Sequence, residues 1–502
     1  MNTKALRQKV LDLAIHGKLV PQNPNDESAT VLLEKIRAEK AEKIKKGELK
    51  ADKKDSFIFV GSDKRHYEQF ADGTIKDIED EIPFDVPEGW AWCRLGNIGK
   101  WQSGTTPNKK NLDYYKNGTI PWLLTGDLND GLVTEIPNCI TEKAFKETSL
   151  KINPIGSVCI AMYGATIGKL GILNTSATTN QACCVCYEFY GINNKYLFYF
   201  LKEHKEEFIQ QGFGGAQPNI SKEKIVDTFI PLPPLSEQEC IVKSIETYFE
   251  QIDSLEENKY DLQIAIKKTK SKILDLAIHG KLVPQDPNDE SAEELLKRIA
   301  TSDNRPYKKF EEDEVPFIIP FNWKWERLAK ISSIISKGTT PRGGKNAYCI
   351  EGINYLRVEN ISADGTINLE DINHISENEH LTFLKRSILQ ENDVIISIAG
   401  TLGKIGIIRK CDLPMNTNQA IAFVRISNLS IINLKYLRYV LESVELQRLL
   451  LSQTKVTSIP NLTLEIINNC PIPLPPIQEQ NRIVSKIEEL FSDLDSISSN
   501  LE

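Results

Sequence analysis

The sequence predicts an α+β fold in which two homologous, strand-rich domains are separated by two long antiparallel coiled-coil helices, with circular pseudo-two-fold symmetry. Three observations predict it: a duplicated sequence, a long stretch without Gly or Pro, and two chain ends that complement each other. The stretch LDLAIHGKLVPQNPNDESATVLL at 11–33 returns at 274–296 with 20 of 23 positions identical. At 502 residues the chain also exceeds the size of one core, so several domains are expected.

The composition is that of a globular protein, with 40% hydrophobic and 26% charged residues. No apolar run approaches the roughly 18 residues of a membrane helix, and the start MNTKALRQKV lacks the apolar region of a signal peptide. A cytoplasmic location is therefore expected. The ten cysteines lack metal-binding spacing, so we expect no metal site and interpret TNQACCVCYEF, with Cys183, Cys184 and Cys186, as a buried strand.

The net charge of −8 is unevenly distributed along the chain. Residues 315–477 carry 17 Lys and Arg against 14 Asp and Glu, and residues 82–235 carry 14 of each. DNA binding depends on a local basic patch more than on the total charge. Two near-neutral or slightly basic domains that are joined to acidic segments are therefore compatible with DNA binding.

The repeat covers most of the chain in the same order, with an offset that drifts from 233 to 242 as small loop insertions would produce. Two copies of one domain suggest two copies of one task. The matching segments are IPFDVPEGWAWCRL (82–95) with VPFIIPFNWKWERL (315–328), SGTTP (103–107) with KGTTP (337–341), GATIGKLGI (164–172) with GTLGKIGI (400–407), TNQA (179–182) with TNQA (417–420), PNIS (218–221) with PNLT (460–463), and IPLPPLSEQ (230–238) with IPLPPIQEQ (472–480).

Seven segments follow from these patterns. They are an N-terminal helical segment with an exit segment (1–40), a charged linker (41–81), the first strand-rich domain (82–235), the central long helix with its exit segment (236–300), a short linker (301–314), the second strand-rich domain (315–477) and a C-terminal helix (478–502).

The central helix is predicted over 236–279, because this stretch contains no Gly or Pro and its apolar residues alternate at spacings of four and three. Ser236 and Glu239 match a capping box, and Gly280 matches a C-terminal cap. Residues 478–502 correspond to the first half of this helix and residues 2–16 to its second half. We therefore expect the two chain ends to meet and to form a second long helix antiparallel to the first.

The ordered motifs resemble the specificity subunit of type I restriction–modification systems over nearly the whole chain. They are W-x-W-x-x-L (Trp90, Trp92, Leu95; Trp323, Trp325, Leu328), the GTTP turns, the NQA segments, IPLPP-x-x-EQ before each long helix and the exit KILDLAIHGKLVPQ. The resemblance implies two target-recognition domains, each reading one half of an asymmetric bipartite double-stranded DNA target, with the long helices as spacer. It also implies two methyltransferase (modification) subunits and a restriction motor-endonuclease subunit as partners. The chain itself would be non-catalytic, with S-adenosylmethionine, ATP and Mg²⁺ held by those partner subunits.

DNA contacts require Lys, Arg or backbone N–H at phosphates and polar side chains at base edges. Four kinds of segment supply them: the GTTP loops, the GK hairpins, the NQ amides, and the turns WLLTGDLN and YLRVENIS, where the copies diverge. Solvated loops, caps and turns are the alternatives for each. The GK segments lack the spacing of a phosphate-binding P-loop, so we reject nucleotide binding there. The candidates are Thr105, Thr106, Asn108, Lys109, Lys110, Thr125, Asp127, Lys169, Asn180, Gln181, Lys337, Thr339, Thr340, Arg342, Lys345, Arg357, Glu359, Asn360, Lys404, Asn418 and Gln419.

Two other functions remain open from the residues alone. A structural coiled-coil dimerisation scaffold suits the helices but not two divergent domains with basic loops. A self-contained DNA methyltransferase or nuclease lacks an N/D-P-P-Y/F tetrapeptide and clustered acidic metal ligands. His16 and His279 end equivalent helices, where capping or packing is expected and catalysis is not.

Overall fold

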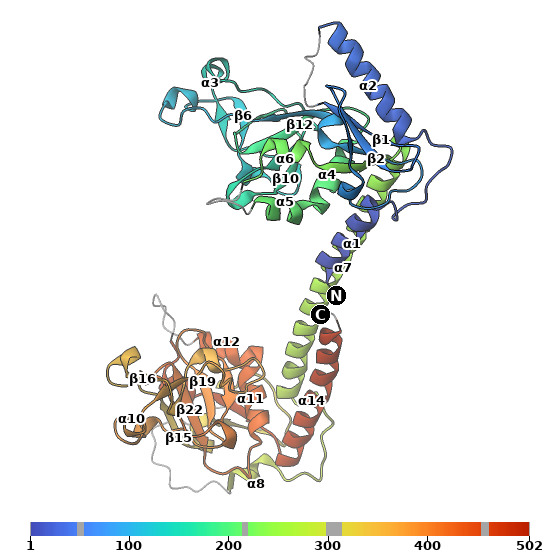
Figure 1. Cartoon of the computed structure of the whole chain (residues 1–502). Helices are drawn as coiled ribbons and strands as arrows, with labels where there is room; N and C mark the ends of the chain where they lie inside the picture. The colour runs from blue at the N-terminus through green and yellow to red at the C-terminus, as the bar shows by residue number, and fades with distance from the viewer. Residues whose placement is uncertain (1, 48–54, 213–218, 298–313, 453–460, 501–502) are drawn as a thin grey trace. The chain divides into compact units, whose positions relative to one another are not determined.

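The computed structural model describes residues 2–47, 55–212, 219–297, 314–452 and 461–500 (Figure 1). It divides into two compact units, the first from Met1 to Asn258 and the second from Lys259 to Glu502. Each unit therefore contains one copy of the repeated strand-rich region together with helices from the arms of the chain.

In the first unit, helix α1 (Thr3–Ile15) lies antiparallel to the first half of α7 (Leu235–Ile278), as Figure 1 shows. The direction follows from contacts at the two ends. Arg7 Nη2 lies 3.2 Å from Glu256 Oε2, whereas Gln22 Nε2, beyond the end of α1, donates to Glu237 Oε1 at 3.3 Å. Leu11 and Ile15 are buried in one cluster with residues of α7. The N-terminal segment thus packs on the central helix as the sequence predicted.

In the second unit, α14 (Ile477–Ser499) lies against the second half of α7 in the same antiparallel way. Lys270 Nζ donates to Asp495 Oδ1 at 2.5 Å, and Gln285 Nε2, beyond the end of α7, donates to Glu479 Oε1 at 2.5 Å. The shared apolar cluster includes Ile273, Leu274, Ala277, Ile278, Ile483, Val484 and Ile487. That the two chain ends meet depends on the placement of one unit against the other and stays a prediction.

The beginning of α7 differs from the predicted capping box. The backbone N–H of Gln238 donates to the carbonyl oxygen of Pro234 at 3.0 Å, so the helix begins at Leu235 and Ser236 already lies inside its first turn. Ser236 and Glu239 are exposed and do not cap it, so the capping-box prediction is wrong. The carbonyl of Pro234 closes the first helical turn instead. A capping box is a pattern of side chains, so it does not predict a bond to this backbone oxygen.

The end of α7 agrees with the prediction that Gly280 caps it. Gly280 has φ +66°, its N–H donates to Ala277, and the N–H of Lys281 donates to the carbonyl of Leu276, which is a Schellman motif. A Cβ on Gly280 would also lie 2.4 Å from Pro320 Cγ. The exit sequence IHGK therefore needs its glycine for both conformation and space.

The described residues of the first unit form four sheets in addition to its helices. A five-stranded sheet has the order β5-β12-β9-β10-β7 and a three-stranded sheet the order β11-β6-β8. The other two are the pair β13-β4 and the sheet β1-β2-β3, with β1 Ser56–Val60, β2 His66–Phe70 and β3 Ile75–Asp77. Cys183, Cys184 and Cys186 are buried in β12, which confirms the buried-strand prediction. The strands are β4 Ala91–Arg94, β5 Gly99–Ser103, β6 Ile120–Leu123, β7 Gly131–Val133, β8 Cys139–Ile140, β9 Val158–Ala161, β10 Leu170–Leu173, β11 Thr178–Thr179, β12 Cys183–Phe189 and β13 Phe229–Leu232.

The second unit repeats this plan with two four-stranded sheets, β15-β22-β19-β20 and β16-β18-β17-β21, and the pair β14-β23. The strands are β14 Lys324–Arg327, β15 Ser332–Lys337, β16 Tyr348–Cys349, β17 Ile353–Leu356, β18 Asn373–Ile375, β19 Val394–Ser397, β20 Ile405–Ile407, β21 Met415–Thr417, β22 Ile421–Ile426 and β23 Pro471–Leu474.

Short helices complete both units. In the first they are α3 Glu142–Glu147, α4 Asn194–Glu203, α5 Lys205–Gly212 and α6 Lys222–Val226. In the second they are α8 Ala292–Lys297, α9 Leu328–Ile331, α10 Glu377–Leu381, α11 Leu434–Glu442, α12 Val444–Ser452 and α13 Leu464–Asn468. No helix in the described ranges is both long enough and apolar enough to cross a membrane.

The segment predicted as a charged linker, 41–81, is largely folded. Helix α2 (Ala29–Lys45) enters it, and β1 (Ser56–Val60), β2 (His66–Phe70) and β3 (Ile75–Asp77) form a three-stranded antiparallel sheet there. Residues 48–54 lie outside the described part of the chain. The sheet is held by contacts that composition does not reveal: the buried Glu68 receives two hydrogen bonds from Arg94, and the guanidinium of Arg37 lies 4.1 Å from the ring centre of Phe57.

Candidate nucleic-acid interface

In the first unit, three of the predicted DNA-contacting segments meet at one edge of the strand-rich domain. The backbone N–H of Thr105 in the GTTP loop donates to Thr179 at 2.9 Å, and Trp122 Nε1 donates to the carbonyl of Thr105 at 3.2 Å. The backbone N–H of Asn180 donates to Leu123 at 3.0 Å. The GTTP loop, the NQ segment and the turn after β6 therefore form one surface.

The glycine of the GTTP loop is required by this close approach. A Cβ at Gly104 would lie 2.2 Å from the carbonyl oxygens of both Thr179 and Asn180. At the equivalent Gly338 it would lie 2.1 Å from the carbonyl oxygen of Asn418. These acceptors belong to backbone, which cannot move as a flexible side chain could, so both loops depend on glycine.

The second unit joins the same three segments in the same way. Thr339 N–H donates to Thr417 at 3.1 Å, Asn418 N–H donates to Leu356 at 3.2 Å, and the Tyr355 hydroxyl donates to the carbonyl of Thr339 at 2.9 Å. Tyr355 thus has the role that Trp122 has in the first unit. The two edges share a backbone arrangement while their side chains differ.

The two turns whose sequences diverge share one hydrogen bond, from a backbone N–H to a side-chain oxygen three residues later. Asp127 Oδ2 accepts from Leu124 N–H at 2.9 Å, and Asn360 Oδ1 accepts from Arg357 N–H at 3.0 Å. Asn360 is buried, so its first role is to hold the turn.

Arg357 carries the chemical difference between these turns. Its Nη2 lies 2.9 Å from Glu359 Oε1, and with the side-chain amide of Asn373 reoriented, Nε and Nη2 both donate to the Asn373 oxygen. The guanidinium is half-buried and fixed in direction, whereas the first unit has the apolar Leu124 there and a half-buried Thr125 beside it.

The GK segments form the predicted hairpins, with β9 antiparallel to β10 and β19 antiparallel to β20. Their lysines differ. Lys404 Nζ donates to the carbonyls of Ile361 at 2.9 Å and Val358 at 3.3 Å, so it supports the Arg357 turn from within. For Lys169, half-buried, no hydrogen bond or ion pair of the side chain is found among the described residues.

The amides of the NQ segments are also unlike. Gln181 and Gln419 are exposed. Asn418 Oδ1 accepts from the N–H of Ala420 at 3.1 Å, whereas Asn180 Oδ1 is buried and has no hydrogen-bond partner in the described part of the chain. Each glutamine is therefore better placed than its asparagine to contact a base edge.

The remaining candidates surround the GTTP loops. Thr105 Oγ1 bonds to Ser149, and Thr106 Oγ1 accepts from the backbone N–H of Gln181 at 3.4 Å, so neither hydroxyl is isolated. The side chain of Lys345 lies outside the described part. Among these candidates around the GTTP loops, the exposed residues are Asn108, Lys109, Lys110, Lys337, Thr340 and Arg342. Which of them contact DNA stays a prediction.

The comparison with known families matches both halves of the chain. The model for the type I restriction modification DNA specificity domain covers residues 87–263 and 320–501. The chain belongs to this family. The resemblance that the ordered motifs indicated is confirmed, and so is the predicted fold class of two strand-rich domains with long helices.

Relatives of this specificity family align over almost the full length. The EcoAI specificity subunit of Escherichia coli is 29% identical, over 97% of this chain and 89% of the relative, and the EcoEI specificity subunit of the same organism is 26% identical, over 99% and 91%. The HsdS subunit from Thermoanaerobacter tengcongensis has a TM-score of 0.51 at 18% identity, over 83% of this chain and 93% of that one. At this identity the solved structure supports the fold alone.

The specificity-family motifs W-x-W, PQ and EQ form a buried polar cluster in each unit. In the first, Trp90 Nε1 donates to Glu237 Oε2 at 2.9 Å and Gln22 donates to the other carboxylate oxygen. In the second, Trp323 Nε1 donates to Glu479 Oε2 at 3.0 Å. Burial raises the pKa of both glutamates. The motifs thus fasten each domain to its helix pair, a role that the repeated EQ and PQ could have signalled.

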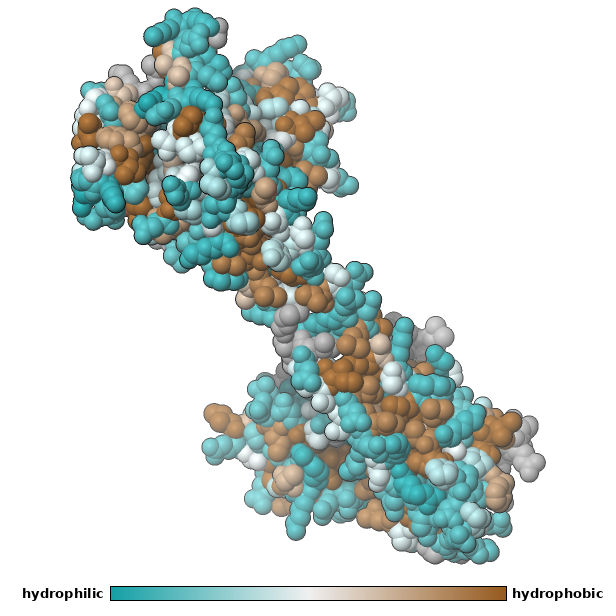
Figure 2. Space-filling model, turned by 90° about the vertical axis from the view of Figure 1, so that its right-hand side faces the viewer, coloured by the Kyte–Doolittle hydropathy of each residue, from teal (hydrophilic) through white to brown (hydrophobic). Residues whose placement is uncertain are grey.

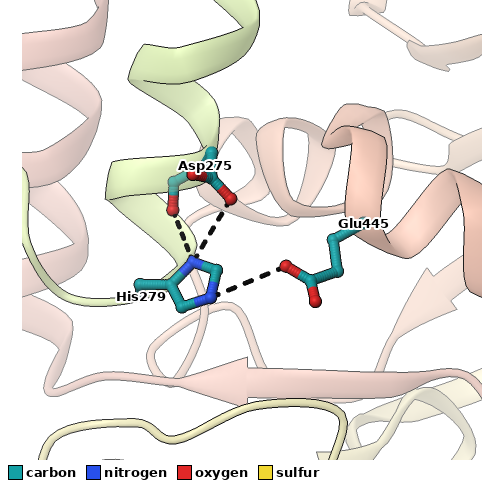
Figure 3. A group of neighbouring side chains, drawn as sticks. All are labelled: Asp275, His279 and Glu445. Atoms are coloured by element: carbon teal, nitrogen blue, oxygen red, sulfur yellow. Dashed lines mark hydrogen bonds and ion pairs between the residues drawn. The ribbon is translucent and has the colours of Figure 1, made fainter.

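The side chains of Asp275, His279 and Glu445 form a group with ligand atoms within 4.8 Å of one another (Figure 3). His279 Nδ1 lies 2.7 Å from the carbonyl oxygen of Asp275, and Nε2 lies 3.6 Å from Glu445 Oε2. The Asp275 carboxylate already accepts from Lys272 at 2.5 Å. The group is an ion-paired helix end, and with the ring of Phe317 4.1 Å from His279 it confirms the predicted packing role.

Proposed function

We propose that this chain is the DNA sequence-recognition subunit of a type I restriction–modification complex, in which each strand-rich domain reads one half of an asymmetric, bipartite double-stranded DNA target. The carrying observation is the family match over both copies, together with the same three-segment edge in each unit. The two edges share one backbone arrangement but carry different side chains. This is the combination expected if one domain design reads two different half-sites.

The long helices support the proposed spacing role. Helix α7 is continuous for 44 residues, which corresponds to about 66 Å at 1.5 Å per residue. A helix sets the separation of two recognition modules more narrowly than a flexible linker does, and half-site spacing follows module spacing.

We further propose that the chain is non-catalytic and acts with methyltransferase and restriction subunits, two of the former. S-adenosylmethionine, ATP and Mg²⁺ would be held by those subunits and not by this chain. The family membership supports assembly with such partners, and a role on host DNA supports a cytoplasmic location for the complex.

Methylation mapping of the host genome tests this function. We expect one asymmetric split motif whose methylation disappears on deletion of this chain and returns with a plasmid copy. Exchange of residues 82–235 for the matching domain of a relative should change only one half of the motif. An unchanged methylome after deletion, or methylation by the purified chain alone, would contradict the proposal.

A further inference from the structure

A groove of about 850 Å³ lies in the first unit beside the three-stranded sheet β1-β2-β3. Its walls are α2, strands β1 and β2, and the segment 85–93 that leads into the strand-rich domain. Every residue of β1 borders it, whereas β2 contributes only His66, Gln69 and Phe70 and β3 contributes none, so the groove lies at the β1 side of the sheet. Figure 2 faces the side of this unit on which α2, β1 and β2 lie in Figure 1, and shows apolar residues at the surface bordered by hydrophilic ones.

Among the described residues, no second strand pairs with β1 at the edge that faces away from β2. In the ladder with β2, Ala71 N–H donates to the carbonyl of Asp55, and antiparallel pairing alternates from there. The N–H and C=O groups of Ser56, Ile58 and Val60 therefore point away from β2. Among the described residues the Ser56 carbonyl has a bond from a side-chain amide, and Val60 is 60% exposed. Such an edge is a template for an added strand.

Trp92, in the wall of the groove, has a buried donor without an acceptor among the described residues. Trp92 borders the groove and is 3% exposed, yet its Nε1 has no hydrogen-bond partner in the described structure. A buried, unbonded N–H costs about 1–3 kcal/mol, so an acceptor such as a peptide carbonyl would be favourable here. The aromatic side chains of Phe57 and Phe59 add apolar lining on β1.

The charges at the rim favour a peptide with basic residues beside its apolar ones. Asp85 and Glu88 border the groove, are exposed, and form no ion pair among the described residues. The guanidinium of Arg37 is instead placed over Phe57 and Lys40 near Tyr190. The uncompensated charge of the rim is therefore negative.

The groove is continuous with the parts that join the domain to its helices. A Cβ on Gly17, just beyond α1, would lie 2.3 Å from Pro87 of the groove wall, and Trp90 of the same wall bonds to Glu237 of α7. A protein bound along α1 and α7 would have the groove beside it.

Among the described residues, the sheet that forms the groove has no counterpart in the second copy. Between the VPQ exit and the W-x-W segment the first copy has 59 residues, 23–81, and the second has 29, 286–314. The second copy is too short to contain both a counterpart of α2 and three more strands. Whatever binds the groove therefore distinguishes one end of the pseudo-symmetric chain from the other.

We propose that this groove binds an extended, basic and apolar segment of the methyltransferase subunit docked on the first unit, which adds as a fourth strand to the free edge of β1. This inference rests on the proposed function for the identity of the partner. It predicts that two copies of one partner are held differently by the two ends of this chain.

Photo-cross-linking in the full-length chain, co-expressed with its methyltransferase subunit, tests the proposal. Val60→p-benzoylphenylalanine should give an adduct that maps to one contiguous methyltransferase segment. Ile75→p-benzoylphenylalanine is the matched control, because Ile75 is 55% exposed on β3 at the opposite edge of the sheet, and should give none. A complex that forms without an adduct from position 60, or an adduct only to DNA or to a second copy of this chain, would overturn it.

Two variants separate binding from folding. Val60→Pro removes an N–H that β2 does not use and should weaken the complex at least about tenfold, while Ile75→Pro, which removes an unpaired N–H from β3, should not. Trp92→Phe, which removes the unbonded N–H, should also weaken the complex, and the melting temperature of the free variant measures the separate cost of the smaller ring. If Val60→Pro and Trp92→Phe both bind the methyltransferase subunit with unchanged affinity, the groove proposal alone is overturned. If the unaltered chain binds no methyltransferase subunit, the proposed function is overturned as well.

Discussion

The two units have the same backbone framework and different exposed chemistry, most clearly at the edge where the GTTP loop, the NQ segment and the divergent turn meet. Thr105 and Thr339 make equivalent backbone bonds, and Trp122 and Tyr355 donate to equivalent carbonyls. At the turn, however, Leu124 stands where the other unit has a fixed Arg357. The difference teaches that duplication preserved the residues that shape the edge while the residues available to a ligand changed.

A second difference lies at the entrance to each domain. Asp85 and Glu88 of the first unit correspond to Ile318 and Phe321 of the second, which are 89% and 91% exposed. A charged rim and an apolar rim at matched positions cannot favour the same ligand. The two units therefore differ at the entrance to the domain as well as at the edge where the GTTP loop, the NQ segment and the divergent turn meet.

The largest expected effect comes from the loop glycines. Gly104→Ala and Gly338→Ala should each lower target methylation by the reconstituted complex about tenfold or more, because the new Cβ meets backbone oxygens and displaces the loop. Equal losses would show that both edges are needed. The control is Gly131→Ala, where the nearest contact would be an ordinary 3.7 Å from Asn129. Full activity in either loop variant would contradict the shared-edge interpretation.

The framework was predictable from the sequence because it depends on local pattern. The four-three spacing of α7, the glycine cap at Gly280 and the buried cysteine strand each reflect a rule that acts over a few residues. The matching of 2–16 and 478–502 to the two halves of α7 predicted which helices pack against it.

The rest depends on contacts between distant residues. The charged segment 41–81 folds because Glu68 meets Arg94 and Arg37 covers Phe57, neither of which composition shows. Lys404 looked like a DNA-contacting residue, yet it donates to two carbonyls of a turn more than 40 residues away. The candidate segments were identifiable, but not that they would meet at one edge.

The next largest effect concerns the divergent turn. Arg357→Leu, which copies the residue at Leu124, should reduce affinity for the target by about tenfold and relax discrimination at one base position of one half-site. Binding to a library of single-base target variants measures it. Lys337→Ala is the comparison, since loss of a phosphate contact should weaken all variants alike. Unaltered discrimination in Arg357→Leu would remove this residue from the recognition edge.

The two hairpin lysines should have opposite effects. Lys404→Met should lower the free energy of unfolding by about 1–2 kcal/mol, because two turn carbonyls lose a charged donor. Lys169→Met should leave stability unchanged and reduce the salt dependence of DNA binding by about one phosphate contact. Chemical denaturation and salt titration measure the two effects. If both variants behave alike, the difference seen between the hairpins has no functional consequence.

The smallest effect is a pH dependence that the two units should share. Because burial raises the folded-state pKa of Glu237 and Glu479, the folded chain holds these protons more tightly than the unfolded chain does. Their contribution to stability is full below the ordinary carboxyl pKa and is lost as the pH rises through the raised values. Glu237→Gln and Glu479→Gln should therefore gain stability relative to the unaltered chain as the pH rises from 4 to 7, by about 1.4 kcal/mol per unit of pKa shift. Melting temperatures measured across this pH range check the prediction, with Glu239→Gln at an exposed position of α7 as the control for the substitution itself. If only one of the two variants gains stability, the Trp–Glu–Gln clusters differ in solvation between the two copies, although their hydrogen bonds join the same residue types.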